Sequence, residues 1–242
     1  MKKNLPSSTV FSAAVKYSFP VLLGYLAIGV AFGLLLVDAG YPWWLAPVMS
    51  VVMYAGAGQY IAVGLFASGT ALWEAVLVQL VVNARHMAYG ITMLKRFNRA
   101  GPFRLYLIYA LTDETFALFT ALPGEDGGYN PAERNRLMFY IALLDQSYWA
   151  AGSLIGALAG SLIPFKLEGI SFSLTALFVV LMIEQMLRVR RPLVFVVSAL
   201  AAVLAVGFLP VRLSILSAMA LSLALTPPAE KLFPPRVSGG RA

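Results

Sequence analysis

The sequence predicts an all-α protein, a polytopic integral membrane helical bundle with about 7–8 transmembrane segments. Of its 242 residues, 60% are hydrophobic and 12% are charged, whereas about a quarter of the residues in an ordinary soluble domain are charged. Apolar runs of about 20 residues, long enough to cross a bilayer core of about 30 Å, follow one another along the chain. The alternating segments of about ten residues that indicate a membrane β-barrel are absent.

Eight candidate spans follow in order along the chain. The fifth is long enough to tilt or to project from the bilayer, and Pro210 makes the division between the last two uncertain. We expect a single transmembrane transport domain over 1–226 and a disordered Pro-rich tail over 227–242. The spans cover about residues 18–37, 44–66, 71–94, 103–122, 136–163, 170–187, 192–209 and 212–226.

The start of the chain, "MKKNLPSSTVFSAAVK", has no long apolar core before Lys16 and no convincing cleavage site. It is therefore interpreted as a cytoplasmic tail that leads into the first span, and not as a signal peptide that is removed. We expect the protein in the cell inner membrane as a multi-pass protein with its N-terminus in the cytoplasm.

The second span predicts a broken helix near 56–58, because "AGAGQ" places Gly56 and Gly58 directly before Gln59. Such a break is tolerated in a bilayer only where protein or a water-filled cavity satisfies the freed backbone groups. Freed N–H groups attract a carboxylate and freed carbonyls attract a cation, while Gln59 adds both a donor and an acceptor. The stretch thus suits a small zwitterionic solute. The alternative is a continuous helix whose glycines admit a close neighbour.

Basic residues in the loops test the topology. Eight simple crossings with the N-terminus inside place eleven lysines and arginines inside and six outside. Four of those six form a cluster whose position outside conflicts with this rule. The cluster moves to the cytoplasm if the second segment, or part of the third, dips into the bilayer and returns. Because the basic residues lie in loops and tails, nucleic acid is not a predicted partner. The cluster consists of Lys95, Arg96, Arg99 and Arg104.

Two glycine pairs suggest a weak internal repeat. "GVAFG" (29–33) and "GALAG" (156–160) each place glycines four residues apart, and each precedes a turn and an apolar segment that ends in a glutamine, Gln59 or Gln185. Internal repeats are common in transporters, but the same spacing is also a helix-packing device, and both interpretations stay open. The glycines predicted to pack helices are Gly29, Gly33, Gly152, Gly156 and Gly160.

The third span carries a polar stripe in "QLVVNARHMAYG" (79–90). Gln79, Asn83, His86 and Gly90 follow helical spacing and share one face, whereas Arg85 points about 100° away from His86. Each ionisable group inside a span costs about 2.5–3.5 kcal/mol on insertion scales, so each needs a reason. A single histidine in a helix is usually structural, but near the midplane it also suits a proton relay.

Carboxylates occupy the fourth and fifth spans. Asp113 and Glu114 lie near the centre of the fourth, and Asp113 is favoured for a cavity because it shares a face with two tyrosines, Tyr106 and Tyr109. The structural alternative is a salt-bridge network, for example between Arg85 and one aspartate. The candidates for proton coupling are Asp113, Asp145, His86 and Glu114.

No enzyme motif stands out. HExxH, GxSxG, a Walker loop and Cys/His metal spacing are all absent, and one histidine without cysteine cannot build a usual zinc site. We therefore expect a protein that is not an enzyme and that has no cofactor and no metal site.

The stretches 54–90 and 111–118 resemble the AzlC-like family of branched-chain amino acid exporters. The likeness extends from "GVAFG" to about Arg191, and its most specific parts are AG-x-x-Q, N-x-R-H-x-x-Y-G and D-E. The family commonly has a serine before the glutamine, where this chain has Gly58, which removes one hydroxyl. The matching residues are Ala55, Gly56, Gln59, Asn83, Arg85, His86, Tyr89, Gly90, Asp113 and Glu114.

The resemblance implies a large subunit that works with a small membrane partner of the AzlD type. Such pairs export leucine, isoleucine, valine and analogues, with proton coupling that makes them antiporters. The alternatives are a passive channel or pore subunit for another small solute and a scaffold without transport. The predicted substrate-binding residues are Gly56, Gly58, Gln59, Asn83, Arg85 and Tyr89.

Overall fold

The computed structural model describes residues 6–122, 129–162, 192–209 and 211–232, with five single positions between 179 and 187. Every element in this part of the chain is a helix, so the all-α class is confirmed there. The chain divides into two compact units, 1–69 with 82–167 and 70–81 with 168–242, which we describe separately. The elements are α1 Ser7–Asp38, α2 Leu45–Val52, α3 Gly56–Ala67, α4 Leu72–Phe97, η1 Gly101–Phe103, α5 Arg104–Tyr109, α6 Asp113–Ala121, α7 Pro131–Leu162, α9 Pro192–Phe208 and α10 Val211–Leu232.

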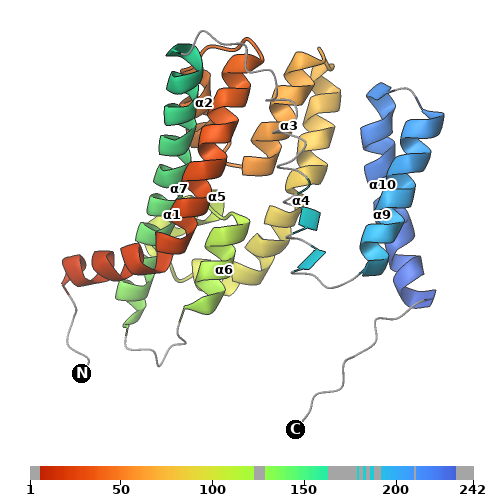
Figure 1. The fold of residues 1–242 in the computed structure, drawn as a ribbon. Coiled ribbons are helices and arrows are strands. Elements are labelled where there is room, and N and C mark those ends of the chain that lie inside the picture. Colours follow the sequence, from red (N-terminus) through yellow and green to blue (C-terminus); the bar gives the residue numbers. More distant parts are fainter. Residues whose placement is uncertain are drawn as a thin grey trace. The chain divides into compact units, whose positions relative to one another are not determined.

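Among the described helices, α1 alone is both long and apolar enough to cross a membrane, by its length and composition. It begins at Ser7, well before the predicted start at 18, so most of the predicted N-terminal tail is helical. Pro20 lies inside α1 and removes one backbone donor there. Figure 1 shows the first turns of α1 at an angle to the rest of the helix.

The glycines of α1 and α7 bring the two backbones into contact. A Cβ atom added at Gly29 would lie 3.0 Å from the Trp149 carbonyl oxygen, and one at Gly33 would overlap the Ser153 carbonyl oxygen. Gly152 in turn faces the Leu26 carbonyl. Residue numbers in α1 and in α7 increase together along this contact, so the two helices run parallel, side by side (Figure 1). The two predicted GxxxG pairs therefore lie in one packed interface, where Gly33 meets Gly156, as small residues do in membrane helices.

The second predicted span is two helices, α2 and α3, separated at 53–55. The predicted break is present, just before the expected position, and Gly56 is the first residue of α3. Tyr54 turns the chain with a φ of 39°, a left-handed conformation that residues other than glycine seldom adopt. A Cβ atom at Gly56 would lie 3.1 Å from the Trp149 ring, so this glycine allows the close approach of α7.

The α2–α3 segment is a hairpin that returns to the end of the unit from which it started. Tyr60 of α3 donates a hydrogen bond to the Ile28 carbonyl. Farther along α3, the ring of Phe66 lies 5.6 Å from that of Tyr41, just beyond the end of α1. The α3 helix therefore runs in the same direction as α1, and α2 runs toward the middle of the unit (Figure 1).

The fourth predicted span is also broken, and the prediction of a continuous helix over 103–122 is wrong. The α5 helix ends at Tyr109 and α6 begins at Asp113. The Thr112 side chain caps α6 by accepting a hydrogen bond from the Thr115 N–H at 3.3 Å. Asp113 and Glu114 thus occupy a first helical turn, where the positive end of the helix dipole stabilises carboxylates.

The α5–α6 segment forms a second hairpin, which enters from the opposite end of the unit. Where the hairpin begins, the ring of Phe103 lies 4.7 Å from that of Phe139, near the start of α7. Where the hairpin ends, the Phe119 carbonyl accepts a 2.6 Å hydrogen bond from Arg96, near the end of α4. The tips of the two hairpins therefore meet midway along α1 and α7.

The basic cluster at the end of α4 lies at the same end of the unit as the start of α1. The Asn135 side chain, in the first turns of α7, donates a 2.7 Å hydrogen bond to the Arg99 carbonyl. The neighbouring Arg136 donates to the Ser7 hydroxyl at 3.4 Å. This is the arrangement that a returning second segment requires. The α7 helix starts before the predicted 136 because Asn130 and Glu133 form a capping box.

In the second unit, α9 and α10 pack against each other, with Ala201 and Ala205 of α9 buried. These helices correspond to the predicted spans 192–209 and 212–226, and α10 continues to Leu232, past the predicted tail boundary at 226. Most of the predicted span 170–187, including Gln185, lies outside the described residues, as does 233–242. The predicted internal repeat therefore stays a prediction.

Candidate functional site

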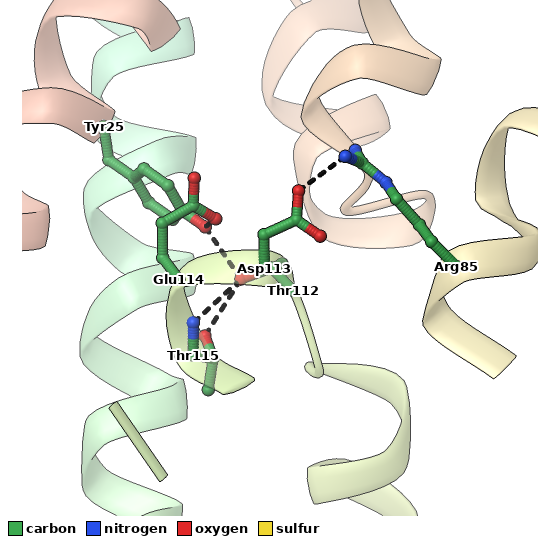
Figure 2. A network of polar contacts seen from close by, with 6 residues as sticks. All are labelled: Tyr25, Arg85, Thr112, Asp113, Glu114 and Thr115. Atoms are coloured by element: carbon green, nitrogen blue, oxygen red, sulfur yellow. Dashed lines mark hydrogen bonds and ion pairs between the residues drawn. The ribbon is translucent and has the colours of Figure 1, made fainter. Parts of the chain in front are cut away.

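A chain of hydrogen bonds joins α1, α6 and α7 where the hairpin tips meet. The Tyr25 hydroxyl donates to Glu114 Oε2 at 2.6 Å and lies 2.8 Å from the Thr112 hydroxyl. The Thr112 and Thr115 hydroxyls are 3.0 Å apart, and Thr115 donates to Asp145 Oδ2 at 2.9 Å. Figure 2 shows Thr112, Glu114 and Thr115, at the start of α6, beside Tyr25. The arrangement places two carboxylates in one polar network.

An ion pair ties α4 to the same turn of α6. Arg85 extends from α4, and its Nη1 atom lies 2.5 Å from Asp113 Oδ2 (Figure 2). Their side chains are 39% and 24% exposed, so the pair is partly buried. It joins α4 to the first turn of α6. It is the contact that the salt-bridge interpretation anticipated.

Gln59 forms a second polar centre, between α2, α3 and α7. Its side chain is fully buried. Its carbonyl accepts a 2.9 Å hydrogen bond from Trp149 Nε1, and its amide donates to the Ser50 hydroxyl at 3.2 Å. Ser50 in turn lies 2.7 Å from the Ser153 hydroxyl. In this conformation the side chain holds the α2–α3 hairpin against α7.

The freed carbonyl of Val51, at the end of α2, is satisfied by side chains from the other hairpin and from α7. It accepts hydrogen bonds from the Tyr109 hydroxyl and, at 3.4 Å, from Gln146 Nε2. Gln146 also accepts a 2.7 Å hydrogen bond from Tyr106. The two helix breaks are thus linked directly, and side chains of the protein satisfy this freed backbone carbonyl.

The predicted site residues fall into two groups. Gly56 and Gln59 lie against Trp149, whereas the α4 candidates lie near α6: the Tyr89 ring stacks on Phe116 at 4.6 Å, and the His86 ring is 6.1 Å from Tyr89. Asn83 is half-buried on the same helix. The first turn of α6 and the facing part of α7 hold the acidic candidates, which are Asp113, Glu114 and Asp145.

Sequence analysis did not identify several residues that build these centres, among them Tyr25, Thr112, Thr115 and Trp149. Thr112 has a local signal, because a threonine followed by two acidic residues is typical of a helix start. Tyr25, Thr115 and Trp149 have none, since each meets at least one partner from a distant part of the chain.

In sequence, the chain is similar to known membrane proteins. The AzlC protein family matches residues 20–163. The Bacillus subtilis branched-chain amino acid transport protein AzlC is 33% identical over 193 residues, which cover 79% of this chain and 74% of that protein. A Helicobacter pylori membrane protein is 42% identical over 175 residues, covering 72% and 75%. The Escherichia coli inner membrane protein YgaZ is 32% identical over 179 residues, 72% of each chain. No solved structure matches.

Both helix breaks and both polar centres lie inside the matched region 20–163. A match over more than half of the chain, together with relatives above 30% identity over most of their own length, establishes its family. The chain therefore belongs to the AzlC family of membrane proteins.

Proposed function

We propose that this chain is the large subunit of a proton-coupled exporter of branched-chain amino acids. The observation that carries the proposal is the meeting of two broken hairpins, from opposite ends of the unit, at a buried acidic network. Half-helices that end near the midplane, with ionisable side chains around them, are how secondary transporters bind solutes and ions. The name of the Bacillus subtilis relative supplies the substrate class.

The geometry suggests how an amino acid binds in this proposal. The first turn of α3 begins with Gly56 and Ala57 and carries no acidic side chain, so the N–H groups at the start of this helix suit the substrate carboxylate. The first turn of α6 carries two carboxylates, Asp113 and Glu114, which suit the ammonium group. Arg85, Asn83 and Tyr89 approach α6 from α4 and orient the solute there.

The proposal includes a topology in which α1, α4 and α7 cross the inner membrane and the two hairpins do not. Because the natural chain has no cysteine, single cysteines at exposed positions can report their side of the membrane. We expect a membrane-impermeant maleimide, applied to intact cells, to label Asp38→Cys and Ser68→Cys and to leave Asn98→Cys unlabelled. Simple crossing by 44–66 predicts the opposite result for Ser68→Cys. Labelling after cell lysis is the control for reactivity.

Efflux of preloaded radiolabelled leucine tests whether the chain needs the proposed small partner, a membrane subunit of the AzlD type. We expect efflux from cells that express both chains, little from cells with this chain alone, and collapse of efflux with a proton uncoupler. Efflux that ignores the uncoupler points to a passive pore, and absence of leucine efflux under every condition refutes the assigned substrate.

A substitution at Asp145 tests the acidic network in the same assay. We expect Asp145→Asn to reduce uncoupler-sensitive efflux about 10²-fold, because a positioned proton-transfer group contributes about 10²–10⁴ in rate. Asp145 is preferred to Asp113 because neutralising Asp113 leaves Arg85 without its partner. Asp38→Asn, at the exposed end of α1, is the matched control and is expected to retain wild-type efflux.

A further inference from the structure

Asp145 is a carboxyl group that forms no ion pair with a cation of the described residues. Its side chain is fully buried. Oδ2 accepts one hydrogen bond, from Thr115, and Oδ1 has no hydrogen-bond partner among the described residues. In that part of the chain the arginine nearest the acidic turn, Arg85, is already paired with Asp113. An unpaired buried carboxylate is strongly unfavourable, so this geometry favours a protonated Asp145.

Three hydroxyl groups connect Asp145 to Glu114 without a gap. The four links measure 2.6, 2.8, 3.0 and 2.9 Å, all within the normal range for O–H···O hydrogen bonds. Glu114 is half-buried, whereas Asp145 is fully buried, so the path runs from a more accessible carboxyl group to an inaccessible one. We name this path the hydroxyl chain, and its members are Tyr25, Thr112 and Thr115.

A count of hydrogens shows how many protons this path holds. With both carboxylates charged, the three hydroxyls supply three hydrogens for four links, so one link stays empty. One added proton fills the last link, and every hydroxyl then donates once and accepts once along the path. A second added proton would leave one O–H group without an acceptor on the path. The path is therefore complete with a single proton.

We propose that Glu114 and Asp145 share one proton, which moves between them along the hydroxyl chain. When the proton passes from Glu114 to Asp145, each hydroxyl releases its hydrogen to the next oxygen and receives one from the previous oxygen. Only O–H bonds form and break, and the net charge of the path is unchanged. The proposal rests on the proposed function, because it identifies the route by which a coupled proton reaches the middle of the transporter.

Other titratable groups surround this path and can influence it. Tyr54, at the tip of the α2–α3 hairpin, lies near both carboxyl groups. Tyr106 of α5 faces Asp145, and Tyr89 of α4 lies near Glu114. In the described part of the chain, none of these tyrosines joins the two carboxyl groups through hydrogen bonds, so the hydroxyl chain is the route to test.

Infrared spectroscopy of the purified full-length chain in lipid tests the proposal without any substrate. The carboxylic-acid C=O band that disappears in Asp145→Asn reports the protonated Asp145, and its shift after transfer to D₂O reports proton exchange. We expect Thr115→Val, which removes one hydroxyl and keeps the shape of the side chain, to slow this shift about 10²-fold. We expect Thr115→Ser to exchange at the wild-type rate.

The controls separate loss of the path from loss of the fold. Thr120→Val is the matched control, because it removes an exposed hydroxyl from the same helix, where it only donates to the Ala117 carbonyl. Tyr25→Phe breaks the path at a different link and is expected to slow the exchange like Thr115→Val. The proposal is overturned if Asp145→Asn removes no carboxylic-acid band, or if Thr115→Val and Tyr25→Phe exchange as fast as the wild type.

The infrared result is independent of the leucine assay. Absence of leucine efflux refutes the proposed function while the exchange measurement still decides whether the path exists. Fast exchange in both variants refutes the path while leucine efflux still decides the function. If both proposals hold, Thr115→Val retains leucine–leucine exchange, which moves no net proton, and loses accumulation driven by a proton gradient.

Discussion

Gly33→Ala is expected to prevent α1 and α7 from packing. The added methyl group would overlap backbone atoms of Ser153 and Ala157, and backbone cannot move aside as a flexible side chain does. Overpacking costs about 1–3 kcal/mol, and occasionally more, and here it separates the two longest helices of the first unit along their contact. We expect a marked fall in the yield of monodisperse protein and in its thermal unfolding temperature in detergent.

The control for this substitution lies on the same helix. A Cβ atom at Gly24 would have no atom within 4 Å, and alanine is favoured over glycine in a helix by about 1 kcal/mol. Gly24→Ala is therefore expected to be neutral or stabilising. An unfolding temperature for Gly33→Ala equal to that of the wild type would show that the two backbones are not in contact.

Gln59→Leu is expected to destabilise the protein by about 1–3 kcal/mol, the cost of leaving a buried polar group without a partner. The substitution removes the acceptor of the Trp149 N–H and one partner of Ser50, both inside the protein. Thermal unfolding of the purified chain measures this effect. We also expect leucine efflux to fall, because the α2–α3 hairpin loses its hold on α7.

A second substitution separates structure from substrate binding at this position. Trp149→Phe removes the stranded N–H and keeps an aromatic ring beside Tyr25 and Phe32. In a double-mutant cycle we expect the pair with Gln59→Leu to couple by about 0.5–3 kcal/mol, so that the double variant recovers stability. If efflux recovers with stability, Gln59 is a structural residue. If stability alone recovers, Gln59 contacts the solute, and additive losses would contradict the hydrogen bond to Trp149.

The break in the second span was predictable because its cause is local. Two glycines in three residues inside an apolar run predict a break, and the break lies at 53–55, directly before both glycines, which belong to the first turn of α3. The second break has an equally local signal in Thr112. The apolar run 103–122 has the length of a single membrane span, however, and that length favours one helix. Asp113 was then favoured over Glu114 by a face pattern that assumes a continuous helix, and that pattern has no meaning across the break.

Long-range partners were not predictable from the single sequence. The spacing of Gly29 and Gly33 predicts a packed face, but it does not say that the neighbour is α7 or that the two helices run parallel. Tyr25 gives no signal of its own, because its contact with Glu114 exists only after α1 and α6 have come together. Composition and periodicity therefore predicted the class of protein and its candidate residues, while the pairings required three-dimensional packing.

The parallel contact between α1 and α7 also constrains how the protein is made. The glycines of α7 leave the ribosome about 120 residues after those of α1, which takes about 6–24 s at about 5–20 residues per second. During that interval the glycine face of α1 has no partner from α7 and must rest against lipid or the insertion machinery. Among the described helices, α1 is the one with the length and apolar composition to lie in a bilayer unaided. The α1 helix is thus able to wait, and the shorter or more polar helices that follow can be inserted beside it.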